Sequence, residues 1–167
     1  MKTEHDLNER GFASDNYAGV HPDVMAALVA ANGGHQVAYG ADVYTARLQE
    51  VMARHFGDDV EAFPVFNGTG ANVVALSAVS DRWSAVVCAD TGHIHVDEGG
   101  APEKLAGLKL FVVPTVEGKL TPEAITAAVP DRAGDVHWAQ PRVLSVAQST
   151  ELGTVYTPDE LRALAEY

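Results

Sequence analysis

The sequence contains one cysteine and too few basic residues to balance its acidic ones. Cys88 is the only cysteine among 167 residues, so an internal disulfide is impossible. Its apolar neighbours, Ala85-Val86-Val87 before it and Ala89 after it, indicate a buried strand residue rather than a reactive thiol. Lys and Arg number 11 against 23 Asp and Glu, a formal net charge of −12. That charge repels phosphate backbones and anionic lipids, which argues against nucleic-acid and membrane partners.

Long apolar runs are also missing. No stretch approaches the roughly 20 apolar residues of a membrane span, and the opening Met1–Asp6 has no apolar core of a secretion signal. This predicts a cytosolic protein. The composition that is present, 47% apolar and 20% charged, is typical of a globular chain with a hydrophobic core. The length suits one compact domain, for which about 100–200 residues is usual.

Cap signals, proline positions and apolar periodicity predict alternating helices and strands. The first predicted helix begins at His21-Pro22 and the last at Thr157-Pro158. Between them, helices are predicted over 42–56, 71–80 and 123–129. The predicted strands are 62–66, 84–89, 108–113 and 142–147. Pro64 makes the first of these an edge or irregular strand, because proline cannot donate to a ladder. The alternation predicts an α/β fold, with a mostly parallel sheet covered by helices.

A glycine-rich segment, Asn67-Gly68-Thr69-Gly70-Ala71-Asn72, lies between a predicted strand and a predicted helix. Free backbone N–H groups and the positive end of a helix dipole favour a phosphate at such a position. The alternative is an ordinary glycine turn, because the segment has neither a full P-loop nor a G-x-G-x-x-G pattern. The segment alone leaves both interpretations open.

Histidines follow the clearest strand directly, in Thr91-Gly92-His93-Ile94-His95-Val96-Asp97-Glu98. The carboxyl ends of parallel strands are where open sheets place their sites. His93, His95 and Asp97 also resemble a metallo-hydrolase ligand run, since alternate residues of an extended segment point the same way. Further ligands would have to come from residues without paired spacing, namely His35, His55 or His137. Taken singly, each histidine fits a hydrogen-bonded structural role, and we assign no metal.

Taken together, five segments resemble, in order, motifs of the threonine aldolases, within the fold type I (aspartate-aminotransferase-like) enzymes that use pyridoxal 5'-phosphate (PLP). The resemblance covers residues 12 to 166. The segments are Phe12-Ala13-Ser14-Asp15-Asn16, Tyr39-Gly40-Ala41-Asp42, Phe66–Asn72, His93–Ala101 and Gln148-Ser149-Thr150-Glu151-Leu152-Gly153. The fold that this implies is a three-layer α/β large domain with a mostly parallel sheet, incomplete in this chain.

The resemblance also implies roles for individual residues. Gly68, Thr69 and Gly70 would hold the cofactor phosphate, and His93 would stack on the pyridine ring. Ser14 would contact the substrate carboxylate, and His137 would lie near the substrate hydroxyl as a base or positioning group. Tyr39 would lie near the cofactor and substrate or at a subunit boundary. Without the resemblance, Ser14-Asp15-Asn16 would be interpreted as a turn and His137 as a loop residue. The remaining implied partners are an amino-acid substrate and further copies of the chain, in a homodimer or homotetramer.

The reaction implied is the reversible cleavage of a β-hydroxy amino acid, threonine or allo-threonine, to glycine and an aldehyde. Enzymes of this kind hold the cofactor through a lysine in a Ser/Thr-Lys context, and none of Lys2, Lys104, Lys109 and Lys119 has that context. We therefore expect that lysine beyond residue 167 of the parent enzyme. Two alternatives stay open: a non-catalytic truncated relative acting as a scaffold, and a metal-dependent hydrolase using His93, His95 and Asp97.

The resemblance further predicts an N-terminal arm over residues 1–20 and the first part of the PLP-binding large domain over residues 21–167. In the sheet order it implies, the strand near Val143 lies between the 62–66 strand and the 84–89/108–113 pair. Gaps on both sides of that strand would be filled by strands that follow residue 167. A lone sheet should then be altered, because unpaired ladder groups in the middle of a domain cost about 1–3 kcal/mol each.

Overall fold

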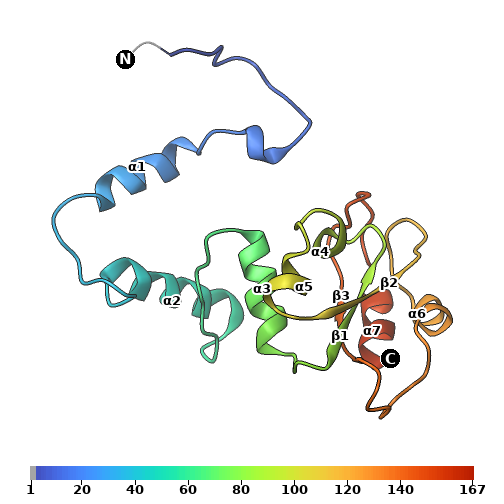
Figure 1. The fold of residues 1–167 in the computed structure, drawn as a ribbon. Coiled ribbons are helices and arrows are strands. Elements are labelled where there is room, and N and C mark those ends of the chain that lie inside the picture. The colour runs from blue at the N-terminus through green and yellow to red at the C-terminus, as the bar shows by residue number, and fades with distance from the viewer. Residues whose placement is uncertain (1–2) are drawn as a thin grey trace. The chain divides into compact units, whose positions relative to one another are not determined.

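The computed structural model of the chain describes residues 3–167 and divides into two compact units, drawn in Figure 1. One unit reaches to Ala62 and the other comprises Phe63–Tyr167. Among the described residues, no helix combines the length and the apolar character that crossing a membrane would require.

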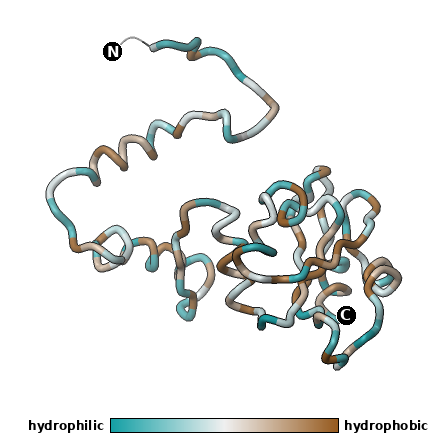
Figure 2. Tube along the Cα trace, viewed as in Figure 1, coloured by the Kyte–Doolittle hydropathy of each residue, from teal (hydrophilic) through white to brown (hydrophobic). Residues whose placement is uncertain are grey.

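The first unit consists of short helices joined by extended segments. It contains the 3-10 helix η1 (Asp15–Tyr17) and the α-helices α1 (Pro22–Ala31) and α2 (Val43–Phe56). The Asp42 carboxylate caps α2 by accepting the backbone N–H groups of Tyr44 and Thr45 at 2.9 and 2.8 Å. Neither α1 nor α2 has a buried residue, and Figure 2 shows the apolar colour of α1.

The second unit is built on a parallel three-stranded sheet. Its strands are β1 (Ser84–Ala89), β2 (Lys109–Val113) and β3 (Gln140–Ser145), in the order β2-β1-β3. The central strand β1 pairs with both neighbours, and every one of its residues is buried. A strand covered on both faces needs a continuous apolar run, which Ala85-Val86-Val87-Cys88-Ala89 supplies.

Helices cover both faces of this sheet and make three layers (Figure 1). Successive side chains of β1 point to opposite faces, so Val86 and Cys88 enter one core and Val87 and Ala89 the other. The first core is shared with α3 (Gly68–Ala78) and α4 (His93–Val96), and α5 (Ala101–Leu105) packs against α3. The second core is shared with α6 (Pro122–Ala128) and α7 (Pro158–Glu166). The predicted three-layer α/β architecture is therefore confirmed.

Most of the predicted elements form, but the strand predicted over 62–66 is wrong. The structure has no strand there. An extended segment becomes a strand only by pairing, and Pro64 has no N–H to offer a ladder. The other predicted strands form within one or two residues of their predicted ends, and the helix expected over 71–80 begins three residues earlier, at Gly68.

The predicted gap between the strand near Val143 and the 84–89 strand is also wrong. β3 pairs directly with β1, with Val143 opposite Val86 and Leu144 opposite Val87. This placement also packs Val143 and Leu144 against the two cores. No described strand pairs with the other side of β3. The sheet of the second unit thus has three strands, and its order differs from the one that the resemblance implies, so the sheet is altered.

The last helix is attached to the rest of the unit by its first turn. Thr157 and Glu160 form a reciprocal capping box, and the Glu160 carboxylate also accepts two hydrogen bonds from Lys119 Nζ, both at 2.9 Å. These hydrogen bonds, that from the Thr157 N–H first, lower the pKa of Glu160 to about 2. The Tyr156 hydroxyl, just before the helix, accepts the Leu120 N–H at 2.7 Å. Leu164 then buries the inner face of α7 in the core.

This attachment predicts an acid-sensitive helix. The folded pKa of Glu160 lies below its ordinary value of 4.5, so its stabilising effect is complete above that value and is lost as the pH falls towards 2. Glu160→Gln keeps a capping acceptor but removes the charge. We expect the variant to melt below wild type at pH 6 and the difference to shrink as the pH falls from 4.5 to 2. Thermal unfolding followed by circular dichroism measures this.

The control is Glu123→Gln, in the first turn of α6, because no described residue forms a hydrogen bond or ion pair with the Glu123 side chain. Its melting difference from wild type should vary less over the same pH range. A Glu160→Gln difference that stays constant from pH 6 to pH 2 would contradict the role given to the Lys119 pairing.

Candidate functional site

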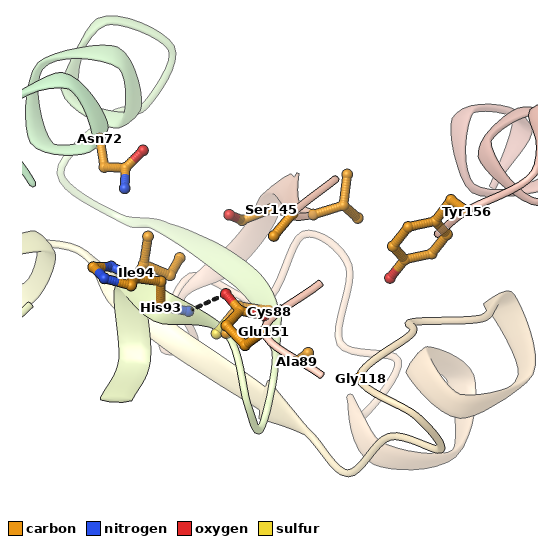
Figure 3. A pocket seen from close by; sticks show the side chains of 12 residues that line it. Asn72, Cys88, Ala89, His93, Ile94, Gly118, Ser145, Glu151 and Tyr156 are labelled. Atoms are coloured by element: carbon orange, nitrogen blue, oxygen red, sulfur yellow. Dashed lines mark hydrogen bonds between the residues drawn. The ribbon is translucent and has the colours of Figure 1, made fainter. Parts of the chain in front are cut away.

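A cavity of about 230 Å³ lies at the carboxyl ends of β1 and β3. This is the edge at which open parallel sheets bind ligands. Figure 3 shows Asn72 and His93 towards one side of the cavity and Tyr156 towards the other, with Ser145, Glu151 and Cys88 between them. The remaining lining residues are Ala89, Gly92, Ile94, Gly118, Val146 and Ala147.

A tight turn after β1 brings His93 to this cavity. The Gly92 N–H donates to the carbonyl of Ala89 at 3.0 Å, and a Cβ on Gly92 would lie 3.0 Å from that same oxygen. A side chain at Gly92 would therefore require the turn to open by a few tenths of an ångström. The turn ends in the four-residue helix α4, of which His93 is the first residue.

Two carboxylates hold His93. Its ring Nδ1 lies 2.9 Å from Oε1 of Glu98, and its backbone N–H donates to Oε1 of Glu151 at 2.7 Å (Figure 3 draws the second bond). The His93 side chain is nevertheless 54% exposed. The ring is thus oriented by the protein and still accessible from outside, as a group that contacts a ligand must be.

Glu98 is the most deeply buried charged group of the site. Its side chain is 0% exposed, and Oε1 accepts a second hydrogen bond from Asn72 Nδ2 at 2.6 Å. Its Oε2 has no hydrogen-bond partner among the described residues. Gly99 and Gly100 follow with φ of 58° and 71°, a left-handed conformation that glycine adopts without strain. This double turn separates Glu98 from α5.

Sequence reasoning gave no role to Glu98, Asn72 or Glu151. The available signal was the five-residue spacing from His93 to Glu98, which the resemblance included without a function for the glutamate. Asn72 gave no such signal, because its contact with Glu98 spans 26 residues and depends on how α3 packs beside α4 and α5.

The glycine-rich segment predicted to bind phosphate forms the start of α3. Asn67 caps the helix by accepting the Gly70 N–H at 2.8 Å. The Gly68 and Thr69 N–H groups belong to the first turn, where a helix has no intrahelical acceptors and a positive dipole end. Asn72 of the same helix lines the cavity. Of the three predicted phosphate contacts, Gly70 has therefore already used its N–H within the protein.

The geometry required by the metal-hydrolase alternative does not form. That interpretation needs His93, His95 and Asp97 in an extended segment, but His93 and His95 lie in the single turn of α4. Residues two apart on a helix do not share a face. Among residues 3–167, no group of three or more His, Cys, Asp or Glu side chains is arranged to hold a metal ion.

Of the predicted site residues in the second unit, His93 lines this cavity, whereas Gly68, Thr69, Gly70 and His137 do not. His137 precedes β3, at the amino end of the strand, whereas the cavity lies at its carboxyl end. Its side chain is exposed, and its N–H donates to Asp135 Oδ1 at 2.9 Å. Ser14 and Tyr39 belong to the first unit. The roles of these three residues therefore stay predictions.

Cys88 lines the cavity from the central strand and is buried, as its apolar neighbours predicted. Burial, with smaller contributions from the carboxylates of Glu103 and Glu151, raises the pKa of its thiol to about 11. The thiol is therefore protonated at neutral pH and is not a nucleophile there.

Comparison with known proteins agrees with this geometry. The chain is 46% identical over 155 residues to the low specificity L-threonine aldolase of Pseudomonas aeruginosa, covering 92% of this chain and 44% of that protein. It is 31% identical over 150 residues to the protein of the same name from Saccharomyces cerevisiae, covering 89% of this chain and 38% of the yeast protein. The chain thus spans less than half the length of these relatives.

A solved structure, titled as an initial structural analysis of Leishmania major threonine aldolase, superposes with a TM-score of 0.81 at 28% identity. The superposition covers 89% of this chain and 43% of that one. The sequence profile of the family described as beta-eliminating lyase matches residues 11–167. The parallel sheet, the site at its carboxyl edge and this match agree, and the chain therefore belongs to the beta-eliminating lyase family.

Proposed function

We propose that the whole protein is a PLP-dependent aldolase that cleaves threonine or allo-threonine, or a similar β-hydroxy amino acid, to glycine and an aldehyde. The observation that carries the proposal is His93, an accessible imidazole oriented by a buried carboxylate at the carboxyl edge of the sheet. Relatives named L-threonine aldolase at up to 46% identity support the substrate class.

The described residues fit a phosphate-bearing aromatic cofactor. The first turn of α3 offers the N–H groups of Gly68 and Thr69 to an anion. Gly70 has no side chain that would obstruct the approach of the anion. His93 offers an aromatic ring fixed at Nδ1 by Glu98, with half of its surface free. When bound, PLP supplies an electron sink for cleavage of the Cα–Cβ bond. The chain's own part is to bind and orient.

The substrate contacts of this proposal are those that the resemblance implies. Ser14 would bind the substrate carboxylate, Tyr39 would lie beside the cofactor and substrate, and His137 would take or position the proton of the substrate hydroxyl. A cytoplasmic homo-oligomer, dimer or tetramer, completes the proposal. The experiment that tests the function is an assay of the full-length protein for glycine formation from L-threonine and L-allo-threonine. Absence of PLP-dependent cleavage of any β-hydroxy amino acid would refute it.

The isolated 167-residue chain should not form a Schiff base with PLP, because no described lysine lines the cavity. Lys104 and Lys109 are exposed elsewhere, and Lys119 is paired with Glu160. We expect no aldimine absorbance that survives desalting. A stable band, trapped by borohydride on one of the chain's four lysines, would contradict this expectation.

In the full-length protein, His93→Ala should weaken cofactor binding and cleavage together. The substitution removes an aromatic stacking face worth about 0.5–1.5 kcal/mol beyond its buried area, or roughly 2- to 13-fold in affinity. Fluorescence titration with PLP and steady-state kinetics measure the two effects. The matched control is His95→Ala, which removes an exposed histidine of the same helix that does not line the cavity. Equal effects of both substitutions would reject the assignment of His93.

A further inference from the structure

The carboxylate of Glu98 is an unusual group to find fully buried. An isolated buried charge costs a large free energy, so such groups are paired and hydrogen-bonded or carry a function. Glu98 has two donors, Asn72 and His93, and both approach the same oxygen. Its second oxygen has none. The side chain is therefore only half satisfied by its surroundings.

The two donors determine what Glu98 does to the histidine. An ionised carboxylate can only accept hydrogen bonds, so a bond between His93 Nδ1 and Glu98 Oε1 requires a proton on Nδ1. A neutral His93 is then the Nδ1–H tautomer, with the lone pair on Nε2. The hydrogen bond also fixes the plane of the ring. This is how a partner on one ring nitrogen determines the state of the other.

Glu98 also connects the ring to α3. Asn72 lies four residues after Gly68, one turn into the helix whose first turn forms the proposed phosphate site. The 2.6 Å bond from Asn72 and the 2.9 Å bond from His93 meet on one oxygen. A glutamine could accept both hydrogen bonds with a smaller desolvation cost than a carboxylate. The charge is thus not needed to satisfy these donors, and what the side chain provides to His93 is an acceptor at Nδ1.

We propose that Glu98 is a positioning residue that acts through His93, fixing the tautomer and orientation of its ring, and that Asn72 ties this pair to α3. The proposal rests on the proposed function, since it treats His93 and α3 as two contacts of one cofactor. Glu98 itself needs no contact with cofactor or substrate.

The first test does not depend on activity. In the cofactor-free full-length protein labelled with ¹⁵N-histidine, nuclear magnetic resonance should show a proton on Nδ1 of His93, with the signal assigned by its loss in His93→Ala. Glu98→Gln keeps an acceptor and should keep this tautomer. Glu98→Ala removes the acceptor and should shift His93 towards the Nε2–H form. A wild-type His93 with an unprotonated Nδ1 would overturn the proposal, whether or not the alanine variant folds.

The second test is a double-mutant cycle on PLP affinity. Glu98→Ala, which removes the acceptor for Nδ1, should weaken PLP binding at least about twofold, the factor that corresponds to the lower end of couplings between contacting residues. In the His93→Ala background the same substitution should have no further effect. Additive losses would mean that Glu98 acts independently of His93, and would overturn the proposal.

The charge control for both tests is Asp97→Asn, which neutralises the exposed neighbouring residue at the end of α4. It should leave the His93 ring signals and the PLP affinity at wild-type values. If the full-length protein does not bind PLP, the proposed function fails while the tautomer measurement still decides the role of Glu98. If PLP binds and Nδ1 is unprotonated, only the present inference fails.

Discussion

The parallel pairing of β1 with strands on both of its sides positions everything else in the second unit. Because its ladder groups are satisfied by β2 and β3, the strand can lie wholly inside the protein and separate two cores. The chain leaves the carboxyl end of β1 through the close turn at Gly92. The position of His93 follows from this constraint, and so does the position of the cavity beside it.

The two faces of the sheet differ in the contacts that hold their helices in place. On the face covered by α6 and α7, the contacts are structural: apolar packing, the Tyr156 hydroxyl and the capping box of α7. The face covered by α3, α4 and α5 combines an apolar core with the buried Glu98 and its donors. A half-satisfied carboxylate stabilises a fold poorly, so this face carries a cost in stability that the other face does not.

The site residues implied by the resemblance agree with the structure at some positions and disagree with it at others. Both point to the start of α3 and to His93. They disagree at His137, which lies at the amino end of β3, whereas the cavity lies at the carboxyl edge of the sheet. The metal alternative fails for a local reason, because a four-residue helix replaced the extended segment that it required.

The sequence by itself determined the elements whose signals are local. Thr121-Pro122 and Thr157-Pro158 mark helix starts, Asp42 and Gly57 delimit α2, and the run around Cys88 marks the buried strand. Side-chain capping, proline geometry and burial of apolar residues act over a few neighbours, so these features can be predicted from the sequence. Pro64 marked 62–66 as an edge or irregular strand, but tertiary structure decided that it pairs with no other strand, that β3 lies next to β1, and that Asn72 meets Glu98. Those outcomes depend on which ladder groups and buried polar atoms find partners far along the chain, and no local pattern encodes that choice.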